Sequence, residues 1–359
     1  MLNNTQYKLL NDKKLTVGYF GGSITEGAGA SDATRTCWRA LTTSWLKEQY
    51  PDCAITEIQA AIGGTGTDLG VFRCERDLLS HNPDLIFFEY SVNDSGADFR
   101  EITANTEAII RKIYTANPYA DIVCIHTTTK SISDKLAQGI EYHSRTAHAS
   151  IMHHYGIPTL DIGETFRTKI LTEGGDWLKL TTDNVHPLDN GYAVYADAVI
   201  AYLRTNLQKA VGETLIPTVL PERLTADNRD SAHMINACEA IGEPDGWSKI
   251  NQTMCRRYDN YIEATTPGAG FEYHFTGRRI GFYLMMAKDS GDIIYRIDGG
   301  EEKTLRTWDH YCLNFNRAQG MVLPETLTEG PHTITIRVSS NKAEESTGTA
   351  IRIGAFLIY

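Results

Sequence analysis

Short apolar segments alternate with helical patterns through the first half of the chain. Apolar residues recur at helical spacing over residues 102–116 and 190–209. Around these stretches, five segments are nearly continuous in hydrophobic, strand-forming residues: 15–20, 54–58, 84–90, 121–126 and 157–162. Such runs are typical of strands buried on both faces, and strand–helix alternation favours right-handed crossovers. The pattern predicts an α/β fold, a three-layer α/β/α sandwich around a parallel sheet.

The pattern changes after Gly212. Prolines then separate short segments of alternating polarity, for example 281–284, 293–297 and 332–338. Asp298-Gly299-Gly300 lies between two such segments and is a hairpin signal. We therefore predict an α/β domain over residues 1–212 and an all-β sandwich over residues 213–359.

The charge balance narrows the classes of partner. The 359 residues include 34 Lys+Arg against 45 Asp+Glu, which gives a net charge of −11. Without a basic run, the chain lacks the electrostatic signature of a nucleic-acid binder or of a polybasic membrane patch. No apolar stretch approaches the ~20 residues of a membrane span. We therefore expect neither nucleic acid nor membrane as a partner.

The cysteines and the first residues bear on the cellular compartment. The first eight residues contain no apolar segment of the kind found in signal peptides. The seven cysteines are odd in number and widely spaced, which favours reduced thiols over a disulfide framework or a zinc site. Both features favour a cytoplasmic protein, with secretion as the alternative. The sequence does not define the oligomeric state.

Four short segments could carry chemistry, because each follows a predicted strand or precedes a predicted helix. They are Gly21-Gly22-Ser23-Ile24-Thr25, Gly63-Gly64, Ser91-Val92-Asn93-Asp94 and Asp183-Asn184-Val185-His186. Ligands of open α/β sheets bind at this edge of the sheet. Taken singly, each segment also has an ordinary explanation as a strand-ending loop, a turn or a helix cap.

Together the four segments contain a complete set of groups for acyl transfer. Ser23 is the candidate nucleophile and His186 its general base. Asp183, three residues before His186, can bond the imidazole and leave its other nitrogen free to take a proton. The backbone N–H groups of Ser23 and Gly64 and the side chain of Asn93 are the candidate oxyanion-hole donors.

These segments resemble the sequence blocks of the SGNH, or GDSL-type, esterases and lipases over about residues 14–209. Two positions depart from the family pattern, since Gly22 replaces the usual Asp and Ser91 the usual Gly, and neither supplies a reacting atom. Gly63 remains an alternative to the preferred Gly64 as oxyanion donor. The matching segments are Gly21-Gly22-Ser23-Ile24-Thr25 to the Gly-Asp-Ser-Leu/Ile block, Gly64 to the family glycine before a polar turn, Ser91-Val92-Asn93-Asp94 to the Gly-x-Asn-Asp block, and Asp183-x-x-His186 to the closing block.

The resemblance implies a flavodoxin-like α/β/α sandwich and a serine esterase with a Ser-His-Asp acyl-enzyme mechanism that needs no cofactor and no metal. The C-terminal half resembles the jelly-roll modules of carbohydrate esterases, which favours small acyl esters, acetyl in particular, of a sugar or oligosaccharide. The alternatives are a lipase or thioesterase of the same fold and a non-catalytic carbohydrate-binding protein. Trp177, shortly before Asp183, either lines the substrate pocket or anchors its loop against the body.

Three other patterns have less support. Gly64-x-Gly66-x-x-x-Gly70, followed by Glu89, mimics a dinucleotide-binding fingerprint but leaves the other motifs unexplained. His143, His148 and His153 point to different faces of a helix, so they cannot share a metal ion, and we expect a hydrated helix surface there. Some aromatic residues of the C-terminal half could stack on sugars, although a β-sandwich core needs most of them: Trp247, Tyr283, Trp308 and Tyr311.

Overall fold

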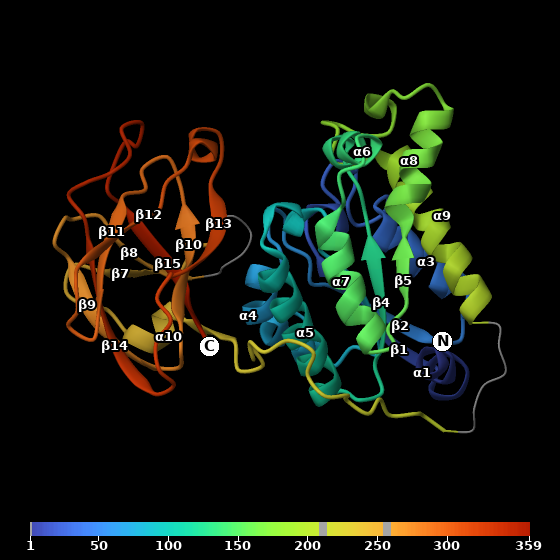
Figure 1. Ribbon diagram of the computed structural model, residues 1–359, viewed down its shortest axis with the longest axis horizontal. Coiled ribbons are helices and arrows are strands. Elements are labelled where there is room, and N and C mark those ends of the chain that lie inside the picture. Colours follow the sequence, from blue (N-terminus) through green and yellow to red (C-terminus); the bar gives the residue numbers. More distant parts are fainter. Residues whose placement is uncertain (1, 208–213, 254–259) are drawn as a thin grey trace. The chain divides into compact units, whose positions relative to one another are not determined.

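The computed structural model describes residues 2–207, 214–253 and 260–359. The chain divides into two compact units, Met1–Asp230 and Ser231–Tyr359 (Figure 1). The boundary predicted after residue 212 lies outside the described residues, and so does Lys209 at the end of a predicted helix. The described residues 214–230 group with the first unit, which places the division 18 residues later than the sequence pattern did.

A parallel five-stranded sheet with the order β2-β1-β3-β4-β5 forms the centre of the first unit. All five strands coincide with the apolar segments that predicted them, and β3 is buried at every position. Parallel neighbours need long crossover connections, which helices supply here. The strands are β1 (Lys14–Gly21), β2 (Ala54–Gln59), β3 (Leu85–Glu89), β4 (Asp121–His126) and β5 (Thr159–Asp161).

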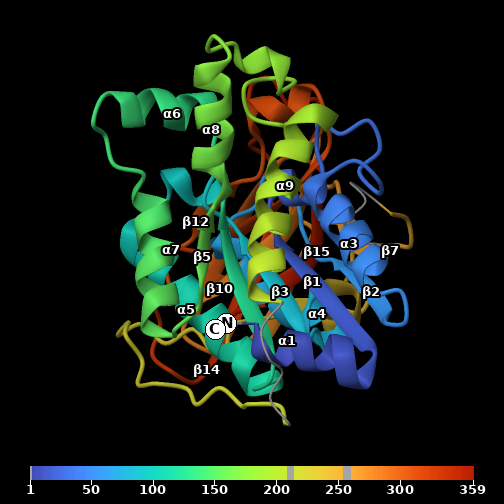
Figure 2. The ribbon, with the colours of Figure 1, turned by 90° about the vertical axis from the view of Figure 1, so that its right-hand side faces the viewer.

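Helices cover both faces of this sheet, which confirms the predicted α/β/α layers (Figures 1 and 2). On one face lie α3 (Trp38–Gln49), α8 (Ile162–Thr172) and α9 (Asp189–Asn206). On the other lie α4 (Thr67–Asp77), α5 (Phe99–Ala116) and α7 (His143–His154). The shorter helical segments are α1 (Asn3–Tyr7), η1 (Lys8–Asp12), α2 (Ser23–Glu26), η2 (Leu79–His81), η3 (Asn93–Gly96), α6 (Lys130–Ala137) and η4 (Trp177–Lys179).

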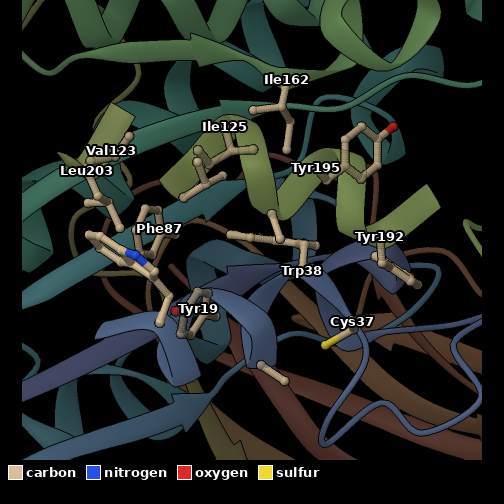
Figure 3. Close-up of a cluster of buried hydrophobic side chains, with 14 of the residues drawn as sticks. Tyr19, Cys37, Trp38, Phe87, Val123, Ile125, Ile162, Tyr192, Tyr195 and Leu203 are labelled. Atoms are coloured by element: carbon tan, nitrogen blue, oxygen red, sulfur yellow. The ribbon is translucent and has the colours of Figure 1, made fainter. Parts of the chain in front are cut away.

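An aromatic cluster joins the sheet to the helices α3 and α9 (Figure 3). Tyr19 of β1 stacks on Phe87 of the neighbouring β3 with ring centroids 5.1 Å apart, and Trp38 of α3 meets Tyr19 edge-on at 5.3 Å. Tyr195 and Leu203 of α9 belong to the same buried cluster. Because each such side chain contributes roughly 1.5–3 kcal/mol on burial, this cluster fixes the packing of the layer.

The second unit is a sandwich of two antiparallel sheets, as the alternating segments predicted. One sheet has the order β13-β10-β15-β8-β7 with β6 beside β15, and the other has the order β12-β11-β14-β9. Phe271 and Ile334 of one sheet and Phe282 of the other lie in one core. The strands are β6 (His233–Asn236), β7 (Ser248–Ile250), β8 (Tyr261–Ala264), β9 (Gly270–Thr276), β10 (Ile280–Met286), β11 (Asp292–Ile297), β12 (Lys303–Arg306), β13 (Arg317–Val322), β14 (Pro331–Val338) and β15 (Ile351–Ile358), with short helices α10 (Ala237–Ile241) and η5 (His310–Leu313).

Three of the four aromatic residues considered for sugar stacking are core residues. Trp247, Tyr283 and Trp308 are buried, whereas Tyr311 is 47% exposed. The six cysteines in the described part of the chain are free thiols, and Cys255 lies outside it. Across residues 2–207, 214–253 and 260–359, no helix combines the length and apolarity that crossing a membrane requires.

Candidate active site

The loops after the first three strands meet at one edge of the parallel sheet. Gly21 at the end of β1 pairs in register with Glu89 at the end of β3. The loop after β1 carries Ser23, and the loop after β2 passes beside it, since a Cβ added to Gly63 would lie 3.3 Å from the Cβ of Ser23. The loop after β3 carries Asn93, so the sheet register brings the three segments together.

A continuous chain of hydrogen bonds runs from Ser23 through His186 to Asp183. The Ser23 Oγ and the His186 Nε2 are 2.8 Å apart, and the His186 Nδ1 lies 2.7 Å from the Asp183 Oδ2. The Asp183 Oδ1 also accepts the backbone N–H of His186 at 2.8 Å. One carboxylate therefore fixes both the ring and the backbone of His186, and favours the tautomer whose Nε2 can accept the serine proton.

The loop that carries Asp183 and His186 is closed on itself before α9 begins. Thr181 and Pro187 form a β-bridge, and the N–H of Thr182 donates to the carbonyl of His186 at 2.8 Å. The His186 side chain is 27% exposed and that of Asp183 is 51% exposed, so solvent and substrate can reach them. Burial raises the pKa of Asp183, but hydrogen bonds from His186 and Val185 outweigh it and hold that pKa below its usual value.

Three hydrogen-bond donors beside Ser23 have no acceptor among the described residues. They are the backbone N–H groups of Ser23 and Gly64 and the side-chain amide of Asn93. The N–H of Gly63, by contrast, donates to the Glu26 Oε2 at 2.8 Å. Since that donor is occupied, the geometry favours Gly64 over Gly63 as the group that can bind an oxyanion.

Gly22 leaves the space that the Asn93 side chain occupies. A Cβ added to Gly22 would lie 1.9 Å from the Asn93 Oδ1, so another residue there would displace Asn93. The departure from the Asp of the resembled pattern therefore has a local physical reason, because glycine lets the Asn93 amide approach the backbone just before Ser23.

The structure places two further side chains that the sequence singled out. Trp177 is 3% exposed and packs beside Phe166, with ring centroids 5.9 Å apart, which agrees with the alternative that it anchors its loop against the body and not with a side chain that lines the substrate pocket. The expectation of a hydrated helix surface was wrong for His148, which is fully buried and donates to the Asp94 Oδ2 at 2.8 Å. Within the described ranges no group of three or more His, Cys, Asp or Glu side chains could hold a metal ion.

A buried carboxylate beneath Ser23 was not assigned a role from the sequence. Glu89 accepts hydrogen bonds from the hydroxyls of Thr25 at 2.8 Å and Thr127 at 2.7 Å. Its full burial raises the pKa of Glu89, whereas the dinucleotide pattern requires a carboxylate that faces the ligand. Because Thr25 lies two residues after Ser23, Glu89 holds the short helix α2 that begins at the serine. The one signal in the sequence is a charged residue at the end of an apolar strand.

The sequence of the first unit matches the model of the GDSL-like lipase/acylhydrolase family over residues 19–194. Residues 19–194 form a GDSL-like lipase/acylhydrolase domain. This confirms the resemblance seen in the four sequence segments, all of which lie in that range. No curated protein sequence matches the chain.

The two-domain architecture also occurs in solved structures. A two-domain esterase (CEX) active on acetylated mannans, co-crystallized with mannopentaose, superposes with a TM-score of 0.80 at 20% identity, covering 98% of this chain and 94% of that chain. A second structure of a two-domain esterase (CEX) active on acetylated mannans gives 0.81 at 19% identity, covering 100% and 95%. At this level of identity the likeness shows that the GDSL-like domain and the β-sandwich share the fold of these esterases.

Proposed function

We propose that this protein is a serine esterase that removes acetyl groups from a carbohydrate. The observation that carries the proposal is the hydrogen-bonded chain from Ser23 to His186 to Asp183, beside three donors that have no acceptor in the described part of the chain. A GDSL-like domain at this position of the chain supports ester hydrolysis as the reaction class.

In the proposed mechanism the Ser23 Oγ attacks the ester carbonyl carbon while the His186 Nε2 takes the serine proton. The N–H groups of Ser23 and Gly64 and the Asn93 amide stabilise the negative oxygen of the tetrahedral intermediate. The intermediate collapses, and His186 returns the proton to the leaving sugar hydroxyl. Water then attacks the acetyl-enzyme with the same base, which releases acetate and restores Ser23.

Two observations support the acetyl group and the carbohydrate as parts of the substrate. The two-domain esterase of the same fold is named as active on acetylated mannans, and one of its structures was co-crystallized with mannopentaose. In this chain, small residues surround the nucleophile, since Gly21 and Gly22 precede Ser23 and Gly63 lies against it. A neutral oligosaccharide that carries acetyl esters is therefore the substrate class that we propose.

The first experiment measures kcat and KM on p-nitrophenyl acetate, butyrate and octanoate for the wild type, Ser23→Ala, Asp183→Asn and the exposed control Ser80→Ala. We expect Ser23→Ala to lower kcat by roughly 10⁶-fold, Asp183→Asn by roughly 10⁴-fold, and Ser80→Ala to leave it unchanged. Substantial activity in Ser23→Ala would refute the nucleophile, and a preference for octanoate would replace the acetyl assignment by a lipase or thioesterase.

The second experiment measures acetate release from acetylated manno- and xylo-oligosaccharides. Release by the wild type and none by Ser23→Ala supports the carbohydrate assignment. Turnover of p-nitrophenyl acetate without release from any acetylated sugar would leave an esterase whose alcohol is of another class. Binding of the sugars without any hydrolysis would favour the non-catalytic alternative.

A further inference from the structure

A buried carboxylate–imidazole pair lies directly behind the Asn93 loop. Asp94 is 2% exposed and His148 is not exposed at all, and the His148 Nε2 lies 2.8 Å from the Asp94 Oδ2. Neither residue reaches the surface, and neither belongs to the proposed triad. A buried pair of ionisable groups needs compensating interactions, because the removal of each group from water costs free energy.

Asp94 connects the two loops that carry candidate oxyanion donors. Its carboxylate accepts the backbone N–H of Thr67 at 2.9 Å and the Thr67 hydroxyl at 2.8 Å. Thr67 begins α4, three residues after Gly64, and Asp94 directly follows Asn93. One carboxylate thus joins the Gly64 loop to the Asn93 loop. Gly66 makes the approach possible, since a Cβ there would lie 2.1 Å from the Asp94 Oδ1.

Among the described residues, the imidazole of His148 makes one polar contact, and that contact is with Asp94. Within the described residues its Nδ1 has no hydrogen-bond partner. The rest of the ring is held by packing, parallel to His126 at a centroid distance of 6.2 Å and edge-on to Phe88 at 5.4 Å. The ring can therefore support the Asp94 carboxylate, and within the described part of the chain it makes no second hydrogen bond.

The helix that carries His148 also holds the rest of the loop after β3. From the first turn of α7, the Ser144 hydroxyl donates to the carbonyl of Ser91 at 2.7 Å, and the His143 Nε2 lies 2.9 Å from the carbonyl of Ala97. These contacts grip the two ends of the segment, and His148 supports its middle, next to Asn93. The helix α7 therefore contacts both ends and the middle of the segment that carries Asn93, and these contacts limit the movement of the Asn93 amide.

We propose that His148 is a positioning residue of the oxyanion hole, acting through Asp94 on Asn93; this rests on the proposed function. With His148 in place, the carboxylate keeps all its donors and holds the Asn93 amide at a fixed distance from the Gly64 N–H. Without it, Asp94 loses a donor and can rotate, which loosens the Asn93 amide. The effect falls on the transition state, because the oxyanion exists only there.

The test is a double-mutant cycle between His148→Leu and Asn93→Ala, followed by kcat, KM and thermal unfolding. We expect Asn93→Ala to lower kcat by about 10²–10³-fold. His148→Leu should lower kcat by about 10–100-fold with little change in KM, because a displaced catalytic group loses about this much. In the Asn93→Ala background, His148→Leu should change kcat by less than about 3-fold, since the group through which it acts is already absent.

Two further variants keep the test decisive. His148→Gln retains a donor for Asp94 and should recover most of kcat, whereas a purely steric role predicts no such recovery. His153→Leu replaces an exposed histidine of the same helix and should behave as the wild type. If His148→Leu does not fold, Asp94→Asn takes its place in the cycle, because the amide keeps the carboxylate's size but disturbs the contact with His148.

The outcomes separate this inference from the proposed function. Full activity in Ser23→Ala would overturn the proposed function itself, whereas full activity in Asn93→Ala would overturn the oxyanion role of Asn93 and with it the positioning role of His148, and would leave the proposed function in place. A large loss in Asn93→Ala, together with an unchanged kcat in His148→Leu, would overturn the positioning role alone. Losses that multiply fully in the double variant would also overturn it, since His148 would then act independently of Asn93.

Discussion

At the scale of single residues, Glu26 occupies one of the two neighbouring glycine N–H groups beside Ser23. Glu26 lies three residues after Ser23 on α2, and its Oε2 accepts the N–H of Gly63 at 2.8 Å. A carboxylate that holds one peptide group fixes the orientation of the next, and the next N–H in the chain is that of Gly64. The candidate donor is therefore set by a side chain on the same short helix as the nucleophile.

This contact predicts a difference between two substitutions of Glu26. Glu26→Gln keeps an acceptor oxygen and should retain kcat within about 3-fold, whereas Glu26→Ala leaves the N–H of Gly63 without that acceptor and should lower kcat about 10-fold, by misplacing the Gly64 donor. Steady-state kinetics on p-nitrophenyl acetate measure both. Equal losses in the two variants would show that charge, not the acceptor, matters at this position.

At the scale of elements, one arginine of α4 ties together the ends of three strands. Arg73 is fully buried and donates to the carbonyls of Ala60 at 2.5 Å and Gly21 at 3.2 Å and to the hydroxyl of Tyr90 at 2.6 Å. Its guanidinium also lies 4.5 Å from the ring centroid of Phe20. These partners follow or end β2, β1 and β3, so Arg73 supports all three loops of the candidate site.

We expect Arg73→Met to lower the free energy of unfolding by about 3 kcal/mol, because it leaves buried carbonyl groups and a tyrosine hydroxyl without their donor. Urea denaturation measures this change. Arg100→Met, on the exposed start of α5, is the matched control and should change the free energy of unfolding by less than about 0.5 kcal/mol. A loss below about 1 kcal/mol for Arg73→Met would contradict the role assigned to this residue.

At the scale of the whole molecule, residues 214–230 belong structurally to the first unit. Glu107 of α5 is fully buried and accepts the N–H groups of Leu224 at 2.6 Å and Thr225 at 2.7 Å, as well as the Thr225 hydroxyl. Burial raises the pKa of Glu107, but these hydrogen bonds outweigh it and hold the pKa below its usual value. The N–H of Thr218 donates to the carbonyl of Pro118 at 2.7 Å in the same unit.

The GDSL-like domain should therefore be more stable as residues 1–230 than as residues 1–212. Loss of the donors from Leu224 and Thr225 leaves the buried Glu107 carboxylate largely uncompensated, which we expect to cost about 3 kcal/mol. Urea denaturation of the two fragments measures the difference. Equal free energies of unfolding would show that residues 213–230 contribute nothing to this unit.

Acid should destabilise the molecule through His126. Burial, followed by the charges of His148 and Arg145, lowers the pKa of His126 to about 3. Since an unfolded histidine titrates near 6.5, the unfolded state binds the proton first, and stability falls as the pH drops from about 6.5 towards 3. Between pH 7 and pH 5 this amounts to about 2 kcal/mol.

His126→Asn removes this titration and should reduce the fall in the free energy of unfolding between pH 7 and pH 5. Urea unfolding of wild type and variant at pH 7 and pH 5 measures it, and the free-energy gap between them should narrow by about 2 kcal/mol at pH 5. A constant gap across this range would show that His126 does not titrate as its burial requires. The contributions of other groups that titrate in this range to the free energy of unfolding cancel in the comparison, because both proteins carry those groups.

The amino-acid sequence by itself determined the local elements and the chemistry at their ends. The apolar runs gave all five parallel strands and the alternation after Gly212 gave the sandwich, because side-chain periodicity follows from backbone geometry within a few residues. The triad candidates could be predicted from the sequence for a related reason. Asp183 and His186 lie three residues apart, and Ser23 follows a strand that ends in glycines.

Only the tertiary structure decided which residues support that chemistry. Each of Arg73, His148 and Glu107 bonds a group that lies 52 to 118 residues away in the sequence, so the packing of separate elements, and no local pattern, brings these partners together. The same holds for Trp177, whose burial depends on α8, and for the division at Asp230. Local patterns fix what each segment can form, and long-range packing fixes which polar groups become buried and must then find a partner.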